Sequence, residues 1–241
     1  LKKFSLSIKK LSKQKKFLFR TAASFISSIS AVKDNPQEPF FYSLLRRKNS
    51  QKKFLPGFLV IGSYTELSTI QLKEFLEISD CAPIELDVFE FFRISKLKHN
   101  EDQLVLFKNK FLAHIRSILM QENTPVLFTS RKEVSLVNKD EQVNFYNSLA
   151  HFISELVSDL KNEIGYLVSK GGITSNVILS NGFKATYVYL QGQIITGVSL
   201  VTFKLENDEN LPIVTFPGNI GNQDSLVKVW SILENKNNSS N

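Results

Sequence analysis

The chain has 241 residues, of which 42% are hydrophobic and 22% are charged, values typical of a globular protein with a sizeable core. No segment approaches the roughly 18 uninterrupted apolar residues that a membrane-spanning helix needs. A single cysteine, Cys81, cannot form an internal disulfide, so we expect a structural thiol and a reducing, cytoplasmic setting.

The net charge of +7 is concentrated near the start of the sequence. Residues 1–53 contain 14 basic and 2 acidic residues, a net charge of +12, whereas residues 54–241 carry 16 basic and 21 acidic residues, a net charge of −5. A basic stretch can bind nucleic acid or an anionic membrane face. Here the basic residues alternate with Phe and Leu and lack an arginine-rich or aromatic-stacking pattern. The favoured interpretation is therefore a solvated helix face, with no membrane partner and with nucleic acid as a minor alternative.

The first 56 residues predict helices and then a connector. Basic clusters alternate with apolar residues over 2–32, which predicts one helix or two. Three prolines and the turn formers Asp34-Asn35 punctuate residues 33–56, which predicts a connector. The apolar residues that could share a helical face are Leu11, Phe17, Leu18, Phe19, Ala22, Ala23 and Ile26.

From residue 58 onward, short apolar runs alternate with amphipathic stretches. The apolar runs predict strands at 58–61, 83–92, 125–128, 166–168 and 213–216, and a hairpin of 185–190 and 193–198 turning at Gly192. The amphipathic stretches predict helices at 68–77, 101–121, 140–162 and 224–233, and a short helix that opens at Thr174.

This alternation predicts an α/β fold with a mostly parallel or mixed sheet, helices on both faces and a basic N-terminal helical extension. The expected domains are a basic segment and linker at 1–55, an α/β domain at 56–234 and a disordered polar tail at 235–241.

Three predicted strands end in Gly-containing turns where a helix begins, at 62–63, 171–175 and 218–221. The carboxyl ends of parallel strands meet at one edge of a sheet, which is where ligands bind in such folds. Glycine lets the backbone approach a ligand closely, and free N–H groups at a helix start hold anions such as phosphate. The sequence contains neither G-x-x-x-x-G-K-[ST] nor G-x-G-x-x-G, so a Walker-type or simple dinucleotide site is not expected.

Metal and nucleophile signals are weak. His99, His114 and His151 show no metal-ligand spacing. Glu85 and Asp87, if both lie on a strand, point to one face and could hold Mg²⁺, although a solvated sheet edge is the favoured interpretation.

The order of several stretches resembles the four-carbon acid sugar kinase family, whose members have an N-terminal sugar-binding domain and a C-terminal nucleotide-binding domain. The resemblance covers nearly the whole chain. The matching stretches are FRTAASF at 19–25, VIGSY at 60–64, TIQL at 69–72, VLFTSR at 126–131, GGITS at 171–175, GV at 197–198 and PGNIG at 217–221, followed by DSL at 224–226.

The resemblance implies an ATP-binding domain that, with Mg²⁺, would transfer the γ-phosphoryl group to a hydroxyl of a small four-carbon sugar acid. It assigns no catalytic base and no metal ligand. The residues that it implies for ATP binding are Ser63, Gly171, Gly172, Ile173, Thr174, Ser175, Gly218, Asn219 and Gly221.

Two departures from the family pattern shape the expectations. The family places Lys-Ser before the last glycine turn, but Phe216 and Pro217 stand there, which removes a phosphate-neutralising lysine and a backbone donor. By the resemblance, residues 1–55 are a basic remnant of the N-terminal sugar-binding domain with a linker, residues 56–234 are the nucleotide-binding domain, and the Asp-Asp-x-Thr-Gly motif of the sugar side does not occur. We therefore expect activity only with a separate chain that carries the sugar-binding domain. An inactive nucleotide-binding remnant is the alternative, and a basic-tailed nucleic-acid-binding protein is the third. Uncovered apolar residues such as Phe17 and Phe19 also favour a homodimer.

Overall fold

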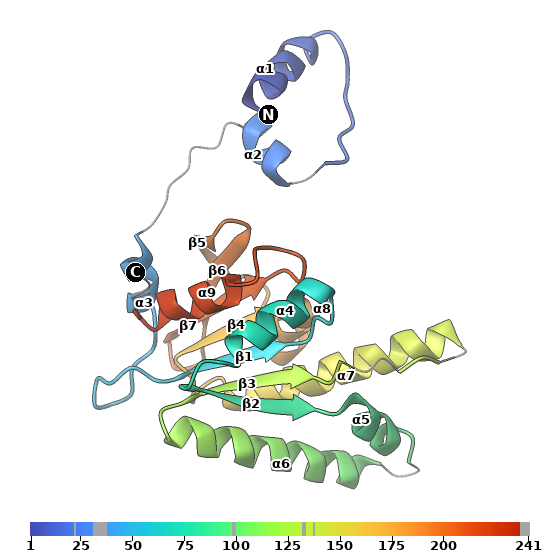
Figure 1. Ribbon diagram of the computed structural model, residues 1–241, viewed down its shortest axis with the longest axis vertical. Coiled ribbons are helices and arrows are strands. Elements are labelled where there is room, and N and C mark those ends of the chain that lie inside the picture. The colour runs from blue at the N-terminus through green and yellow to red at the C-terminus, as the bar shows by residue number, and fades with distance from the viewer. Residues whose placement is uncertain (22, 31–37, 98–99, 132–133, 137, 237–241) are drawn as a thin grey trace. The chain divides into compact units, whose positions relative to one another are not determined.

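The computed structural model describes residues 1–21, 23–30, 38–97, 100–131, 134–136 and 138–236. It divides into two compact units, Leu1–Pro36 and Gln37–Asn241, which are described separately (Figure 1). Within the described segments, no helix is both long and apolar enough to cross a membrane.

The first unit contains two helices, α1 (Lys2–Leu11) and α2 (Ala23–Ser30). The two contact each other through the Phe4 and Phe25 rings, whose centroids are 5.7 Å apart, and through a 2.9 Å hydrogen bond from Ser5 Oγ to Ser28 Oγ. Residues 17–19 lie in the segment between the helices, so their predicted place on a helical face is wrong. Ala22, the turn residues 34–35 and Pro36 lie outside the described residues.

The second unit is built on one seven-stranded sheet with the order β2-β3-β1-β4-β7-β6-β5. The first five strands in this order run parallel, and β6 and β5 are added antiparallel. The predicted mixed α/β sheet is confirmed. The strands are β1 (Gly57–Ile61), β2 (Cys81–Leu86), β3 (Thr124–Thr129), β4 (Tyr166–Lys170), β5 (Tyr189–Ile195), β6 (Val198–Lys204) and β7 (Asn210–Phe216).

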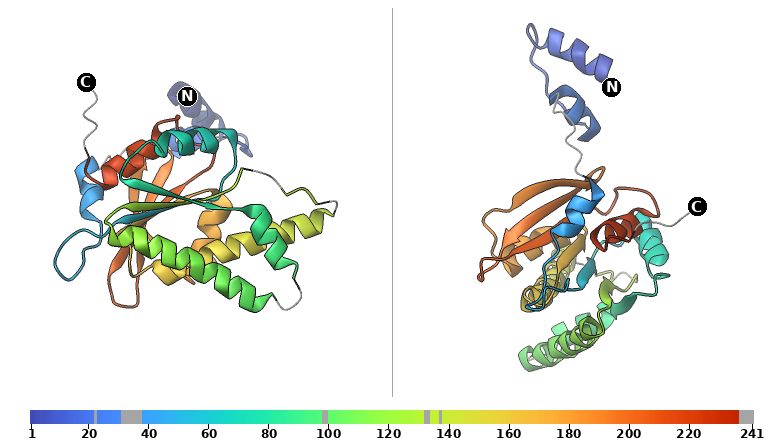
Figure 2. Two further views of the ribbon diagram at one scale, coloured as in Figure 1. Left: turned by 60° about the horizontal axis from the view of Figure 1, so that its bottom comes forward. Right: turned by 90° about the vertical axis from the view of Figure 1, so that its left-hand side faces the viewer.

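Helices cover both faces of the sheet, as expected for buried parallel strands (Figures 1 and 2). One core joins the sheet to α4 and α9, and the other joins it to α6 and α7. Successive side chains of β4 point to opposite faces of the sheet, so Leu167 packs in the core on the α7 side and Val168 in the core on the α9 side. The helices are α3 (Pro39–Leu44), α4 (Glu66–Phe75), α5 (Val88–Ser95), α6 (Glu101–Met120), α7 (Lys139–Leu160), α8 (Gly172–Val177), the π-helical turn η1 (Ile178–Gly182) and α9 (Ser225–Leu233).

The predicted strand at 83–92 is wrong beyond Leu86. The side chain of Asp87 accepts hydrogen bonds from the N–H groups of Phe89 and Glu90, at 2.8 and 3.3 Å, and so caps the start of α5. Such a cap satisfies helix N–H groups that have no partner within the helix. The apolar run that follows Asp87 therefore belongs to helix α5, which buries Val88 and Phe91, rather than to a continuing strand.

The predicted hairpin is also displaced. Its turn lies at Thr196-Gly197, between β5 and β6, and Gly197 adopts a φ of 80° that suits a tight turn. Gly192 instead lies inside β5, beside a register shift, and has a φ of 142°. A Cβ atom there would lie 2.7 Å from the Tyr42 hydroxyl, so the glycine marks a close approach rather than a turn.

The predicted connector contains a docked helix. Tyr42 of α3 is 2% exposed, and its hydroxyl donates to the Gln193 carbonyl oxygen at 3.0 Å. Burial raises the pKa of this phenol above its ordinary value. Residues 38–56 therefore pack as part of the sheet-containing unit.

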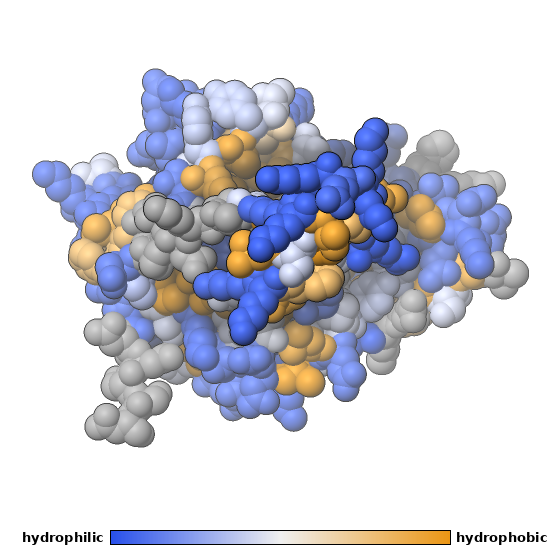
Figure 3. All heavy atoms as spheres, turned by 90° about the horizontal axis from the view of Figure 1, so that it is seen from above, coloured by the Kyte–Doolittle hydropathy of each residue, from blue (hydrophilic) through white to orange (hydrophobic). Residues whose placement is uncertain are grey.

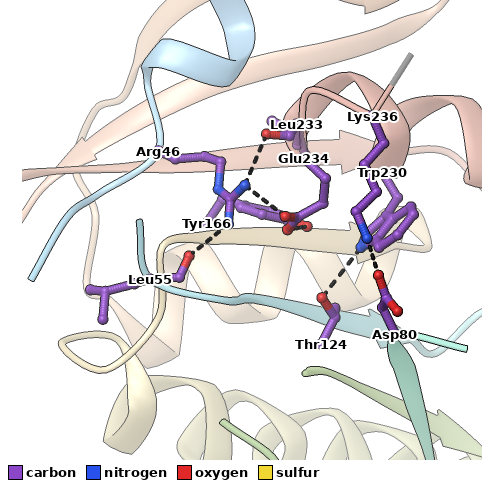
Figure 4. Close-up of polar contacts among 9 residues, drawn as sticks. All are labelled: Arg46, Leu55, Asp80, Thr124, Tyr166, Trp230, Leu233, Glu234 and Lys236. Carbon is purple, nitrogen blue, oxygen red and sulfur yellow. Dashed lines mark hydrogen bonds and ion pairs between the residues drawn. The ribbon is translucent and has the colours of Figure 1, made fainter. Parts of the chain in front are cut away.

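A buried polar network closes the amino ends of the strands (Figure 4). Arg46 pairs with Glu234 at 2.6 Å and donates to the Leu55 carbonyl oxygen at 3.0 Å, while the Tyr166 hydroxyl donates to Glu234 at 2.7 Å. At the same end of the sheet, Lys236 forms an ion pair with Asp80, and its ammonium group lies 4.7 Å from the Trp230 ring centroid. Residues 237–241 of the predicted tail lie outside the described residues.

On the face shown in Figure 3, hydrophobic residues lie among hydrophilic ones. Exposed apolar residues of this kind are ordinary for protein surfaces.

Candidate functional site

The carboxyl ends of β1, β4 and β7 lie side by side at one edge of the sheet. The register places Ile61 beside Lys170, and Lys170 beside Phe216, so the three strands end at the same level. The residues that follow are Gly62-Ser63, Gly171-Gly172 and Pro217-Gly218. The structure thus brings the three glycine-containing turns of the sequence to one place, as the parallel topology requires.

The three turns meet around Ser63. A Cβ atom added to Gly218 would lie 2.3 Å from Ser63 Oγ, and one added to Gly171 would lie 3.2 Å from the Ser63 nitrogen. A Cβ atom on Gly62 would lie 2.2 Å from Thr174 Oγ1. A side chain at Gly218 or Gly62 would force its neighbour to move, and one at Gly171 would be tightly packed, so the glycines allow the turns to touch.

Backbone hydrogen bonds fix the first two turns. The Lys170 carbonyl oxygen accepts from the N–H groups of Gly62 and Ser63, at 3.1 and 3.2 Å, and the Gly171 N–H donates to the Phe216 carbonyl oxygen at 2.9 Å. Gly171 has a φ of 127°, a conformation that side-chain-bearing residues rarely adopt. The turn after β4 therefore depends on glycine at this position.

Side chains of α4 hold the third turn by its carbonyl groups. Thr65 Oγ1 and Ser68 Oγ each donate to the Gly218 carbonyl oxygen at 2.9 Å. Gln71 Nε2 donates to the carbonyl oxygens of Ile220 and Asn222 at 3.1 and 2.6 Å. Since α4 occupies the carbonyl groups, the N–H groups of this turn remain available for another partner.

Two runs of backbone N–H groups have no hydrogen-bond acceptor within the described part of the chain. They belong to residues 172–174 and 218–221. Successive unpaired N–H groups form a concave donor surface suited to an anion. This edge can therefore bind an anionic group through its backbone alone.

The two hydroxyl residues after Gly171 point in different directions. Thr174 Oγ1 lies against Gly62 at the rim of the pocket described below, and no described residue forms a hydrogen bond with it. Ser175 Oγ lies 3.0 Å from the Ser169 carbonyl oxygen and 2.9 Å from the Ser169 hydroxyl. Thr174 is thus free to contact a ligand, whereas the Ser175 hydroxyl is engaged inside the fold.

A pocket of about 520 Å³ opens beside these turns, between the ends of β1 and β3 and the first half of α7. Its walls are mainly apolar, and the rings of Tyr64 and Tyr146 stack across it with centroids 6.3 Å apart. Pockets that combine apolar walls with a few polar groups are the usual form of small-molecule sites. The polar residues in its lining include Thr129, Ser130, Arg131, Lys139, Gln142 and Asn147.

Two cationic side chains, those of Arg131 and Lys170, contact the turns after β1 and β7. Arg131 Nη1 donates to the Ser63 carbonyl oxygen at 2.6 Å, while Arg131 Nε and Nη2 are buried with no hydrogen-bond partner in the described chain. Burial lowers the pKa of Arg131, an effect that the charge of Glu85 opposes. Lys170 is fully buried, and burial together with repulsion by Arg131 lowers its pKa to about 8.

The sequence alone assigns neither cation a role. Arg131 enters only as the end of the matching stretch at 126–131, and Lys170 is not among the predicted site residues. The available signal is position, because Arg131 comes two residues after the end of β3, and Lys170 is the last residue of β4 and immediately precedes Gly171-Gly172.

The acidic pair does not form a metal site. Glu85 is an exposed strand residue, and Asp87 caps α5 with its carboxylate. In the described residues, no group of three His, Cys, Asp or Glu side chains could hold a metal ion. His114 and His151 lie in helices, and His99 lies outside the described residues.

Comparison with family models gives one match. Residues 58–226 match the model of a nucleotide-binding C-terminal domain. The matched region contains every turn residue discussed above. No curated protein matched the sequence.

Comparison with solved structures gives similar folds. Two crystal forms of a DUF1537 protein from Bordetella bronchiseptica, a domain-swapped dimer with bound citrate, match at TM-scores of 0.57 and 0.54 and identities of 18% and 17%. They cover 75% and 80% of this chain and 41% and 42% of the other. A protein described as a putative tRNA synthase from Salmonella typhimurium LT2 matches at a TM-score of 0.51 and 15% identity, covering 72% of this chain and 40% of the other. At these identities the likeness shows a shared fold, and the chain spans about two fifths of the length of these proteins.

Proposed function

Since the chain belongs to the nucleotide-binding C-terminal domain family of the DUF1537, or four-carbon acid sugar kinase, proteins, we propose that it binds ATP at the carboxyl ends of β1, β4 and β7. In this proposal it is the ATP-binding part of a kinase that phosphorylates a small sugar acid. The observation that carries the proposal is the convergence of three glycine turns around Ser63, with two runs of unpaired N–H groups.

The phosphates would lie on the backbone amides of residues 172–174 and 218–221, beside Ser63 and Thr174. Phosphate groups carry negative charge and accept several hydrogen bonds, which matches a surface of free donors flanked by Lys170 and Arg131. The Ser175 hydroxyl contributes to the fold rather than to the ligand, because Ser169 engages it.

The nucleoside would occupy the adjoining pocket. Its volume and its apolar walls suit a flat ring with a ribose, and the Tyr64 ring offers a face on which a base can stack. Thr174 lies between the pocket and the turns. A single ATP molecule could therefore place its base in the pocket and its phosphates on the amides.

The pocket lining has no carboxylate and no imidazole among the described residues. Mg²⁺ usually keeps several waters and binds ATP enzymes through the phosphates and one or two carboxylates. Mg²⁺ bound with ATP would supply neutralisation of the phosphate charge. The residues of this chain would contribute the amides, the Thr174 hydroxyl and the two cations.

Phosphoryl transfer also requires the acceptor to be positioned. We include in the proposal a sugar-binding half that lies outside residues 1–241, with a separate chain as its expected carrier, since these residues span about two fifths of the structural relatives. A nucleotide-binding protein without transfer activity is the second candidate, favoured by Phe216 and Pro217 at the positions before the last glycine turn.

The test is calorimetric titration of the protein with Mg-ATP at physiological salt. We expect binding in the micromolar range, and a loss of about tenfold in Thr174→Val, which removes one hydroxyl without changing volume. Ser175→Ala is the matched control, with a cost to stability and little change in affinity. Absence of binding at millimolar ATP would refute the proposal.

A second measurement separates the two candidate functions. The protein would be mixed with a DUF1537 sugar-binding domain, Mg-ATP and four-carbon sugar acids, and ADP release would be followed. Release that depends on both the acid and this chain supports the kinase. ATP binding without release in any mixture supports the binding-only alternative.

A further inference from the structure

Lys170 has surroundings that its role in the fold does not explain. The side chain is fully buried at the end of β4, with Nζ 3.9 Å from the centroid of the Phe216 ring. Its single hydrogen-bond acceptor in the described chain is the Pro217 carbonyl oxygen, at 3.2 Å. No carboxylate of a described residue forms an ion pair with it.

Burying an ammonium group without a counter-charge is unfavourable, because the group loses its hydration and gains no opposite charge. The Phe216 ring face and the Pro217 carbonyl oxygen compensate only part of the lost hydration free energy. Anchoring the turn does not require a charge, since neutral hydroxyls of Thr65 and Ser68 hold the next carbonyl group, that of Gly218. A structural role alone would be served as well by a neutral side chain.

The position of the charge suggests the missing partner. The carbonyl oxygen of Lys170 holds the Gly62-Ser63 turn, and its side chain reaches the turn that begins at Pro217. The unpaired N–H groups of residues 172–174 follow it directly, and those of 218–221 follow its acceptor. Arg131, which also forms no ion pair with a described carboxylate, contacts Ser63 from just beyond the end of β3.

We propose that Lys170, together with Arg131, provides the positive field that compensates the nucleotide phosphates, so that the site discriminates between nucleotides by their number of phosphates. The inference rests on the proposed function and deepens it. Because Lys170 is covered by protein, it is a positioning residue: it acts through its charge and through Pro217, while the turn amides make the direct contacts. The family pattern has a lysine where this chain has Phe216, and Lys170 of β4 would supply the positive charge that this replacement removes.

The experiment compares adenosine, AMP, ADP and ATP by calorimetry in four proteins: wild type, Lys170→Met, Lys170→Arg and the control Lys73→Met. Lys73 is an exposed residue of α4. In wild type we expect affinity to rise with each added phosphate. In Lys170→Met we expect at least a tenfold loss for ATP, a smaller loss for AMP and no change for adenosine. Lys170→Arg should recover part of the loss, and Lys73→Met should match wild type.

A pH series on the wild type gives a readout that needs no variant. In the described chain, Arg131 is the one charged group whose field shifts Lys170, so the lysine titrates beside a constant positive charge. ATP affinity should fall as pH rises through and above about 8, and binding in that range should take up protons, whereas adenosine binding should do neither.

The outcomes separate this inference from the proposed function. Equal losses for adenosine and ATP in a folded Lys170→Met protein would show a purely structural lysine and overturn the inference. Unchanged ATP affinity in that variant, or ATP affinity in wild type that is flat from pH 7 to 9.5, would overturn it while leaving nucleotide binding intact. Failure of the wild type to bind ATP would overturn both.

Discussion

Arg46 and Glu234 are 188 residues apart in the sequence, and their side chains form an ion pair of 2.6 Å at the amino ends of the strands. Both side chains are nearly covered, at 9% and 13% exposed, and the Tyr166 hydroxyl also donates to Glu234. The ion pair joins the segment before β1 to the residue that follows α9. The polar network that stabilises the fold thus lies at one end of the sheet, and the candidate site lies at the other.

Glu234→Ala should lower the free energy of unfolding by about 3 kcal/mol, because it leaves the Arg46 guanidinium buried without its carboxylate. Urea denaturation checks this. Asp80→Ala is the control: it breaks a pair with Lys236 in which both side chains are about half exposed, and should cost below about 1 kcal/mol. Equal costs for the two variants would contradict the assignment of the buried network as a main source of stability.

Gly171→Ala should cost about 1 to 3 kcal/mol of stability and abolish most ATP binding. The position has a φ of 127°, and a Cβ atom would press on Thr174 and on the Ser63 nitrogen. The neighbouring Gly172→Ala is the matched control for stability, since nothing lies within 4 Å of its Cβ position. Thermal unfolding of both variants and calorimetry on Gly171→Ala check the prediction, which fails if the two variants lose the same stability.

Lys170→Met should raise the free energy of unfolding at pH 7 by about 1 to 3 kcal/mol, because an apolar side chain replaces a buried charge beside Phe216. The pKa of Lys170 falls from the ordinary lysine value to about 8 on folding. Between pH 8 and 10.5 the unfolded chain therefore holds more protons, and wild-type stability gains as pH rises.

The advantage of the methionine variant should accordingly be largest below pH 8 and shrink toward pH 10.5. Chemical denaturation at pH 7, 8.5 and 10 measures it. A variant that is less stable than wild type at pH 7 would show that the contacts of Lys170 outweigh the cost of its burial.

Cys81 should be nearly inert toward thiol reagents in the folded protein. Burial, with the nearby carboxylates of Asp80 and Glu234, raises its pKa to about 12, so the reactive thiolate is scarce at neutral pH. We expect a disulfide reagent to modify it at least a hundredfold faster in urea than in buffer. Rapid modification without urea would indicate that this sheet edge opens readily.

The local sequence is sufficient to predict an element when its apolar pattern begins and ends where the element does. The amphipathic pattern of residues 101–121 and the apolar run 58–61 match α6 and β1 closely. The strand predicted across Asp87 is wrong because the Asp87 side chain caps a helix there. The spacing of apolar residues, on which the strand prediction rests, contains no information about such a cap. The hairpin was displaced because Gly192 is required by Tyr42, a contact between residues 150 positions apart.

The candidate site shows the same limit. The glycine turns could be found because each one lies at the end of an apolar run. That they meet at Ser63 follows from strand order, which the sequence alone did not specify. Lys170 could not be recognised, since its partners Phe216 and Pro217 come from another strand and its significance depends on having no carboxylate nearby.

The amino-end network has a consequence for how the chain acquires its structure during synthesis. Arg46 and Arg47 are made early, but their carboxylate partners, Glu234 and Glu209, lie in the last 33 residues. The turn that carries Glu209, just before β7, and the helix that ends before Glu234 must leave the ribosome before these charges are neutralised. The α/β unit should therefore reach its native state only once α9 and Glu234 have left the ribosome, and ribosome-bound chains that stop before α9 should remain open to proteases.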